Sequence, residues 1–314
     1  MMLEQLGIER ITLDLPFRLN HVNCFVAEGK NGYVVIDTGL HNAETVAHWD
    51  KVLEGKKVTD LYITHYHPDH FGYAGGLQQK YNARVSMSEV DADNGLSAWD
   101  DELLSKLLDN YKRCEIPTEV GQEMLDNTNT FIPLVTPYPK IDHYFQENER
   151  VQIGKYEYRV IFTPGHSDGL ITFFNEDKKV LISTDHILPR ITPNISYWFH
   201  GDDNPLKTYL QSLDKVRALN ADYVIPSHGE PFFDANKRID EIKVHHDNRL
   251  NEMLEIMKTN ETVYDICQGM FNFELTIHET RFAIGETIAH LEYLRHKGEV
   301  DREVVHGVWY YKQI

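Results

Sequence analysis

Short apolar runs separated by turn residues open the chain, and each has the length and the β-branched or aromatic content of a strand. They predict three consecutive β-strands, over residues 9–17, 21–29 and 31–39. Asn31 and Gly32 form a tight-turn dipeptide between the second and third strands, because both residues tolerate positive φ. The next segment, 41–55, places apolar side chains at helical spacing and ends in Gly55. The chain therefore begins as a hairpin-rich sheet followed by a helix.

The strand pattern continues in two further blocks, with a helical block between them. A strand over 58–65 runs into a histidine-rich loop, and the glycines of 71–82 indicate a closely packed helix start. From about residue 88 to residue 141 the alternation disappears, and a helix over 96–114 followed by a proline-containing stretch predicts a helical insertion. Strands then resume, and a helix and a last strand follow: 149–154, 156–165, 170–175, 178–185, then 205–220 and 223–229.

Two halves that each combine strands with helices predict a mixed α/β fold, with two packed sheets flanked by helices in four αββα layers. After Pro231 the pattern changes to helices alone, over 238–258, 262–271 and 279–300, and the chain closes with two short apolar runs. Gly298 fits a helix cap and Gly307 a hairpin turn. Three helices and a hairpin are the elements of a winged helix. We expect a catalytic domain over 1–233 and a small winged-helix domain over 234–314.

Composition excludes several classes of protein. The formal net charge is -18, which argues against nucleic acid or an anionic membrane as a partner. No apolar run approaches the roughly 18 residues of a membrane span, and the first residues lack the pattern of a signal peptide, so a cytoplasmic location is expected. The three cysteines lie far apart in the sequence, which predicts buried thiols rather than a disulfide framework or a thiolate metal cluster.

The segment THYHPDH, residues 64–70, places three histidines and a carboxylate in one loop after a strand. By chance such a cluster arises on the order of a few times in a thousand sequences of this composition. Imidazole nitrogens with carboxylate oxygens suit zinc, and also iron or manganese, rather than calcium or magnesium. His65 and His67 alternate in extended backbone, while Asp69 and His70 lie at a turn, so one loop can serve two metal ions.

One loop cannot complete two coordination spheres, so further ligands must come from later strand ends. The sequence offers His166 in TPGHS, Asp185 in STDH and His228 in PSHGEP, each after a strand-like run and beside a turn residue. All three could therefore meet the first loop at one edge of the sheets.

The ordered series IDTG, THYHPDH, TPGHS, STDH and PSHGE resembles the metallo-β-lactamase superfamily of hydrolases over roughly the first 235 residues. The resemblance implies the αββα fold and two bound metal ions. It implies that His65, His67 and His166 hold the first ion, that Asp69, His70 and His228 hold the second, and that Asp185 bridges them. Asp37 of IDTG would orient the metal loop without binding metal. One departure is Ser183-Thr184, where many relatives have a smaller residue before the bridging aspartate.

Two adjacent metal ions, most simply zinc, would lower the pKa of a shared water and present hydroxide at neutral pH. Asp185 would hold the two ions together and Asp69 would orient the hydroxide, so these two carboxylates are the predicted catalytic residues. The expected substrate is a small ester, thioester or lactone. His186 could stabilise an oxyanion or simply pack, and the aromatic residues 197–199 could form core or line a pocket.

Other functions stay open from the sequence. An endoribonuclease of the same superfamily and a DNA-binding regulator with a hydrolase-like sensor domain are the alternatives. Residues 237–314 carry ten Lys or Arg against fourteen Asp or Glu, which favours a lid or homodimer role for this segment over DNA binding. A site kept only for structure is disfavoured, because structural zinc sites are normally closed by four ligands.

Overall fold

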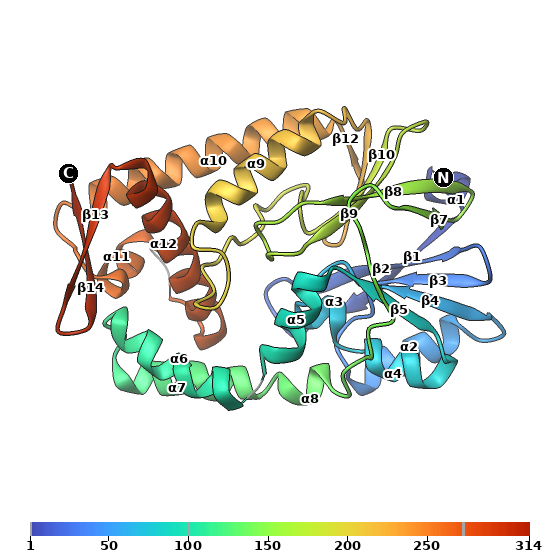
Figure 1. Ribbon diagram of the computed structural model, residues 1–314, viewed down its shortest axis with the longest axis horizontal. Coiled ribbons are helices and arrows are strands. Elements are labelled where there is room, and N and C mark those ends of the chain that lie inside the picture. The colour runs from blue at the N-terminus through green and yellow to red at the C-terminus, as the bar shows by residue number, and fades with distance from the viewer. Residues whose placement is uncertain (1, 100, 272–273) are drawn as a thin grey trace.

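Two six-stranded sheets packed face to face dominate the computed structural model, which describes residues 2–99, 101–271 and 274–314 (Figure 1). The first sheet contains β1 (Ile8–Asp14), β2 (His21–Glu28), β3 (Tyr33–Ile36), β4 (Val58–Tyr62), β5 (Arg84–Met87) and β6 (His143–Tyr144). The second contains β7 (Arg150–Ile153), β8 (Tyr156–Phe162), β9 (Ile171–Asn175), β10 (Val180–Thr184), β11 (Tyr223–Pro226) and β12 (Phe232–Phe233). Neighbours in each sheet follow chain order. The strands β3 to β6 are parallel, and so are β10 and β11.

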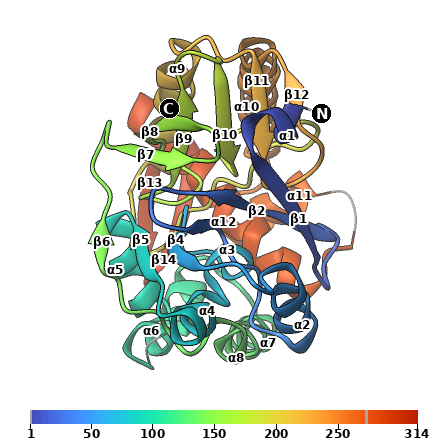
Figure 2. The ribbon, with the colours of Figure 1, turned by 90° about the vertical axis from the view of Figure 1, so that its right-hand side faces the viewer.

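Helices cover the outer faces of both sheets and also form the insertion and most of the C-terminal segment (Figure 1). They are α1 (Met2–Leu6), α2 (Ala43–Val52), α3 (Pro68–Phe71), α4 (Ala74–Tyr81), α5 (Glu89–Ser97), α6 (Asp101–Arg113), α7 (Thr118–Asn129), α8 (Ile132–Val135), α9 (Pro205–Arg217), α10 (Ala235–Ile256), α11 (Val263–Met270) and α12 (Ile277–Lys297). In Figure 2, α2 and α4 lie below the first sheet, while α9 and α10 lie in the upper part of the view with the second sheet. The predicted mixed α/β architecture is confirmed.

The interface between the sheets is an apolar core formed by alternate side chains of the strands. Phe25 and Ile36 of the first sheet and Phe173 and Ile182 of the second belong to this cluster, and all four are fully buried. Burying a side chain of this size contributes about 1.5–3 kcal/mol. The two sheets therefore pack against each other through this core. Because β9 is antiparallel to β8 and β10, and β11 is parallel to β10, the carboxyl ends of β8, β10 and β11 point to the same edge of the second sheet.

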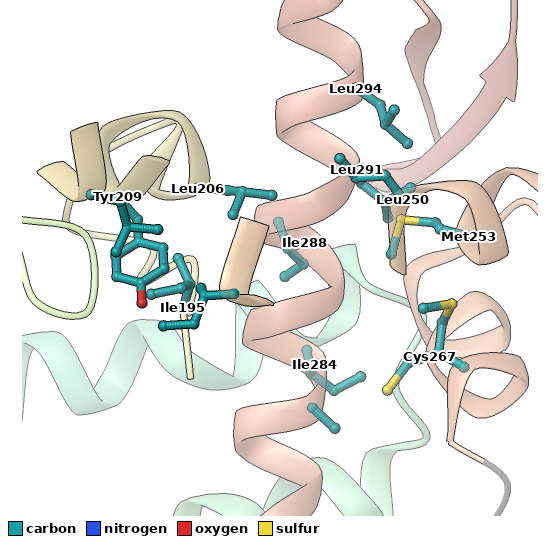
Figure 3. Close-up of a cluster of buried hydrophobic side chains, with 14 of the residues drawn as sticks. Ile195, Leu206, Tyr209, Leu250, Met253, Cys267, Ile284, Ile288, Leu291 and Leu294 are labelled. Carbon is teal, nitrogen blue, oxygen red and sulfur yellow. The ribbon is translucent and has the colours of Figure 1, made fainter. Parts of the chain in front are cut away.

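Another cluster of buried residues joins the second sheet to the helical parts of the chain. It includes Met124 of α7, Leu181 of β10, Leu213 of α9 and Ile288 of α12. Figure 3 shows Ile284, Ile288, Leu291 and Leu294 along one face of α12, with Leu206 and Tyr209 of α9 on one side and Leu250 and Met253 of α10 on the other. The insertion, the second sheet and the C-terminal helices thus share one core.

The C-terminal segment has the order of elements that the sequence predicted. Helices α10, α11 and α12 are followed by a hairpin of β13 (Val300–Val305) and β14 (Val308–Gln313). Gly298 caps α12 with φ of 76°, and Gly307 turns the hairpin with φ of 86°. The winged-helix assignment itself stays a prediction.

The helical insertion differs from its prediction, because α7 and α8 were not predicted and the single predicted helix is divided. Instead of one helix over 96–114, α5 ends at Ser97 and α6 begins at Asp101, and position 100 lies outside the described residues. Across the described ranges, none of the helices combines the length and the apolar character needed to cross a bilayer.

Candidate metal centre

The loop after β4 carries four of the seven predicted ligands. His65 and His67 lie between β4 and α3, while Asp69 and His70 belong to the first turns of α3. Pro68 occupies the first helical position, where its fixed φ suits the helix and its missing N–H costs nothing. The sequence HPDH therefore switches the chain from extended to helical backbone within the site, which divides the four side chains into two pairs.

The other three predicted ligands also follow strands. His166 lies in the loop after β8, Asp185 directly follows β10, and His228 lies two residues after β11. These strands belong to the second sheet, whereas β4 belongs to the first. The site is therefore assembled across the edge of both sheets from segments more than 160 residues apart.

The structure brings all seven side chains together. Ligand atoms within each of three groups lie within 4.8 Å of one another, and the groups are His65, His67 and His166, then His65, His70 and Asp185, then Asp69, His70 and His228. Asp185 occupies the middle, because its Oδ2 lies 3.4 Å from Nε2 of His166, 3.5 Å from Nε2 of His70 and 3.3 Å from Nε2 of His228. Two clusters that share one carboxylate are the arrangement a dinuclear centre requires.

Several atoms that point into this cluster have no hydrogen-bond partner among the described residues. Nε2 of His70, His166 and His228 and Oδ1 of Asp185 are buried and make no hydrogen bond. A buried polar atom without a partner normally costs on the order of 1–3 kcal/mol, so such a concentration calls for a ligand. Divalent transition metals bound by imidazole and carboxylate fit these donor atoms.

The second nitrogen of each of three imidazoles is held in place. Nδ1 of His70 donates to Oδ2 of Asp37 at 2.8 Å, Nδ1 of His166 donates to the Asn194 carbonyl at 2.7 Å, and Nδ1 of His228 donates to the His21 carbonyl at 2.6 Å. Each bond fixes the tautomer that leaves Nε2 free for a metal ion. The contacts of Asn194 and His21 could not be predicted from the sequence, since both residues act through backbone oxygen.

Asp37 binds the metal loop at a second point as well. Its Oδ1 accepts the backbone N–H of Thr64 and its Oδ2 accepts the Thr64 hydroxyl, both at 2.9 Å. Asp37 is fully buried with φ of 58° directly after β3. The predicted orienting contacts of Asp37 are thus present in the structure.

A second buried carboxylate, Asp91 of α5, holds the loop that carries His166. Its Oδ2 accepts the Ser167 hydroxyl and its Oδ1 accepts the Gly169 N–H, both at 2.6 Å. A Cβ at Gly169 would lie 2.7 Å from the Asp91 carboxylate, so a residue without a side chain is needed there. Burial raises the pKa of Asp91 to about 7. No sequence motif pointed to Asp91.

The pKa values of the histidines shift in opposite directions in the two halves of the site. Burial, followed by neighbouring imidazoles, lowers the pKa of His65 and of His67 well below 6.5, which favours the neutral form that binds metal. Burial opposes protonation of His70 and His228 too, but the carboxylates, chiefly Asp185, raise the pKa of both. Although burial favours the neutral acid of Asp185, His228 and His70 hold the pKa of Asp185 well below 3.8. The half that contains the carboxylates therefore carries compensating charges.

A cavity of about 490 Å³ opens from this cluster. His67, Asp69, His166, Asp185 and His228 lie at one end of it. The remaining wall is mostly apolar and comes from the first sheet's loops, the insertion, the loop before α9 and α12, and it includes Phe17, Trp99, Phe131, Tyr197, Trp198, Phe199 and Phe282. The aromatic residues 197–199 are therefore pocket residues.

His186 does not take part in this wall. It is fully buried beside Tyr209, with ring centroids 5.4 Å apart, and burial lowers its pKa to about 3. The packing role is the one that the structure supports.

Two known protein families match this chain. Residues 18–228 match the Metallo-beta-lactamase superfamily, and residues 250–314 match the family described as Metallo-beta-lactamase-like, C-terminal domain. The chain belongs to the metallo-β-lactamase superfamily, and it is a hydrolase of that superfamily with a His and Asp metal-binding cluster.

The chain is also similar to individual proteins, of which three are described below. The solved structure of a beta-lactamase domain protein from Burkholderia ambifaria is 31% identical, with a TM-score of 0.87 over 98% of this chain and 92% of that one. A probable metallo-hydrolase of Bacillus subtilis (strain 168), YqjP, is 21% identical over 90% of this chain and 91% of its own length. An uncharacterized protein of Aquifex aeolicus (strain VF5) is 30% identical, but the match covers 52% of this chain and 64% of that protein.

Proposed function

We propose that this protein is a dinuclear metal-dependent hydrolase of a small, apolar ester, thioester or lactone. The observation that carries the proposal is the set of unpartnered buried ligand atoms at the end of an apolar cavity. His65, His67 and His166 hold one ion in this proposal, Asp69, His70 and His228 hold the other, and Asp185 serves both. The name of the Bacillus relative, a probable metallo-hydrolase, agrees with this assignment.

When bound, two divalent ions would polarise the carbonyl of the substrate and lower the pKa of water toward neutrality. The residues of the chain supply position and charge. Asp69 is the more exposed of the two carboxylates, with 19% of its side chain accessible against 7% for Asp185, and it lines the cavity. We assign to Asp69 the orientation of the attacking water and to Asp185 the fixed separation of the two halves of the site.

Zinc is the proposed metal, with iron and manganese as the alternatives to be tested. Five imidazoles and two carboxylates suit all three ions, and zinc accepts a four- or five-coordinate arrangement without a redox cycle. Hydrolysis requires none of the electron transfer that iron or manganese would add.

The cavity favours a small substrate over RNA. Its wall is dominated by apolar side chains, whereas nucleic-acid sites combine basic residues along the backbone with stacking surfaces. We propose that the C-terminal segment, whether or not it is a winged helix, forms part of the cavity wall, since His278, Phe282 and Ile284 of α12 line it.

Metal content and turnover of matched substrates test the proposal together. Protein purified without chelator should hold about two equivalents of transition metal by elemental analysis, and it should hydrolyse 4-nitrophenyl hexanoate, hexanoyl thioesters or a hexanolactone. Chelation should abolish turnover and zinc should restore it. His166→Ala and His228→Ala should each lower both metal content and turnover, while His48→Ala, an exposed histidine of α2, should change neither.

Two results would reject the proposal. One is metal-replete protein with no activity on any of these substrates beyond that of the chelated protein. The other is metal-dependent cleavage of labelled single-stranded RNA in the absence of ester, thioester or lactone hydrolysis, which would favour the endoribonuclease.

A further inference from the structure

Arg281 is a partly buried cation that lines the cavity. It lies on α12 and lines the same cavity as the metal cluster. Its guanidinium lies over the rings of Phe131 and Phe282, 5.5 and 5.1 Å from their centroids, and one amino group donates to the Thr128 hydroxyl at 3.0 Å. The Nε atom is buried and has no hydrogen-bond partner. Most of the five donors of this guanidinium are therefore unused by the described residues.

No carboxylate of the described residues forms an ion pair with Arg281. Burial lowers its pKa, and the tyrosine hydroxyls of Tyr111 and Tyr66 are the groups that oppose this effect. Other arginines of the C-terminal segment are paired: Arg249 lies 3.1 Å from Glu252, and Arg295 lies 2.7 Å from Glu292. A guanidinium stays protonated in proteins, so a positive charge is held in an apolar wall without a counter-ion.

Away from the metal cluster, the other unpartnered polar atoms of the wall are also nitrogens, and they include Nδ1 of His278. The indole Nε1 atoms of Trp99 and Trp198 are buried, lack hydrogen bonds and belong to cavity-lining residues. An indole nitrogen can only donate. Of the carboxylates that line the cavity, Asp69 and Asp185 belong to the metal cluster, and Glu279 is paired with Arg18 at 2.9 Å. Away from the metal cluster, the wall thus offers donors and one positive charge to a ligand with acceptor oxygens.

We propose that Arg281 binds a carboxylate of the substrate, and that the substrate is an apolar acyl compound with a carboxylate at a position other than the bond that is cleaved. This inference rests on the proposed hydrolase function. A planar guanidinium binds a carboxylate through two parallel hydrogen bonds, and removal from water strengthens them. The C-terminal segment thereby contributes substrate selection to the site.

A purely structural role for Arg281 would predict a different effect of its substitution on substrate preference. Its contact with Phe131 connects α12 to the insertion, and a cation over an aromatic ring is stabilising. Loss of such a contact would impair all substrates alike. Loss of a carboxylate contact would change the preference between a charged and an uncharged substrate.

Two esters with acyl chains of equal length separate these roles. The zinc-loaded full-length protein is assayed with 4-nitrophenyl hexanoate and with mono-4-nitrophenyl adipate, which replaces the terminal methyl group by a carboxylate, each corrected for uncatalysed hydrolysis. Wild type should prefer the adipate ester at least tenfold in kcat/KM. Arg281→Met should lower this ratio 10- to 100-fold, mainly through KM, whereas Arg281→Lys should keep a large part of it. Arg249→Met, which removes a cation outside the cavity, should leave the ratio unchanged.

Each outcome decides one question. A wild-type ratio near one, or an Arg281→Met ratio equal to that of wild type, overturns the carboxylate contact while leaving ester hydrolysis intact. Inactivity on both esters counts against the proposed function. In that case, the contact is still tested by comparing the binding of hexanoate with the binding of 1-hexanol, both measured by tryptophan fluorescence. The preference of wild type for the anion must be weaker in Arg281→Met or Arg281→Lys. Equal preferences in wild type and variants reject the carboxylate contact.

Discussion

The side chains that bind metal depend on a second set of contacts made by their other nitrogen atoms. His70, His166 and His228 each donate Nδ1–H to an oxygen, so each presents Nε2 to the cluster in one tautomer. Two of these oxygens are backbone carbonyls that no side-chain substitution removes. The carboxylate of Asp37 is the one that can be changed, and it also holds Thr64 through two bonds.

Substitution of Asp37 by Asn should weaken binding of the ion near His70. An amide presents one acceptor oxygen where the carboxylate accepts three donors, so at least one buried donor loses its partner. Changes to such outer contacts typically lower metal affinity 10- to 100-fold. Competition with a chelating dye measures this loss. Asp50→Asn, which alters an exposed carboxylate, is the control, and equal affinity in Asp37→Asn and wild type would contradict the assigned role.

Among the elements, α5 connects the insertion to the second sheet through Asp91. The two hydrogen bonds of Asp91 span 76 and 78 residues of sequence and close on the loop of His166. The loop is also held by the bond of His166 to the Asn194 carbonyl and by the Ser212 hydroxyl, which donates to the Pro164 carbonyl, so α5 supplies one of several contacts that position His166.

Asp91→Ala should therefore affect one half of the metal cluster more than the other. It removes the acceptors of Ser167 and Gly169, so the ion held by His65, His67 and His166 should bind about tenfold more weakly. Titration with zinc under competition should show one site weakened and the other nearly unchanged. Asp93→Ala, on the exposed side of the same helix, controls for changes to α5 itself. Equal weakening of both sites would show that Asp91 acts through general stability.

Helices α10 and α12 are joined by a pair of buried histidines with a predictable pH dependence. Nδ1 of His290 donates to the Glu286 carbonyl at 2.8 Å, so its Nε2 accepts from Nδ1 of His246 at 3.1 Å. Burial is the main cause that lowers the pKa of both; Arg249 and His245 lower them further, and Glu286 opposes this for His290. Tyr209 packs on His246. Both imidazoles are therefore neutral in the folded protein.

Acid should destabilise this pair. Below the unfolded pKa of about 6.5 the unfolded chain binds protons that the folded chain does not, so stability is full above that pH and decreases as the pH falls through it. Between pH 7.5 and pH 5.5, the free energy of unfolding should decrease by about 1 kcal/mol more in wild type than in His246→Gln. Chemical denaturation at the two pH values measures this difference. Metal release affects both proteins alike, so equal decreases would refute the prediction.

The parts of the elements that could be predicted from the sequence are those encoded locally. Gly298 and Gly307 identify a helix cap and a hairpin turn because glycine accepts positive φ. The ligands could be found because the short motifs that contain them follow apolar strands and resemble the motifs of a known superfamily. Asp91 and Arg281 could not be found, since their significance comes from contacts with residues far away in the sequence. The break between α5 and α6 was missed because the apolar spacing continues across it.

At the scale of the whole molecule, the site is enclosed by parts that fold around one core. The cluster that contains Ile288 of α12 also contains Met124 of the insertion and Leu181 of the second sheet. Helix α12 lines the cavity at its first turns and packs in this core farther along. The C-terminal segment is thus coupled to the metal centre through shared packing as well as through Arg281.

Ile288→Ala should therefore destabilise the entire protein and not the C-terminal helices alone. Ile288 is fully buried, and truncation of such a side chain costs about 2–5 kcal/mol. Unfolding followed by circular dichroism and unfolding followed by release of zinc should shift together to lower denaturant concentration, because one cooperative core supports both signals. Val304→Ala, on β13 with 57% of the side chain exposed, should leave both curves in place. If only the circular dichroism curve moved in Ile288→Ala and zinc release kept its wild-type midpoint, the C-terminal helices would be an independent unit, and their part in the cavity wall would not depend on a common core.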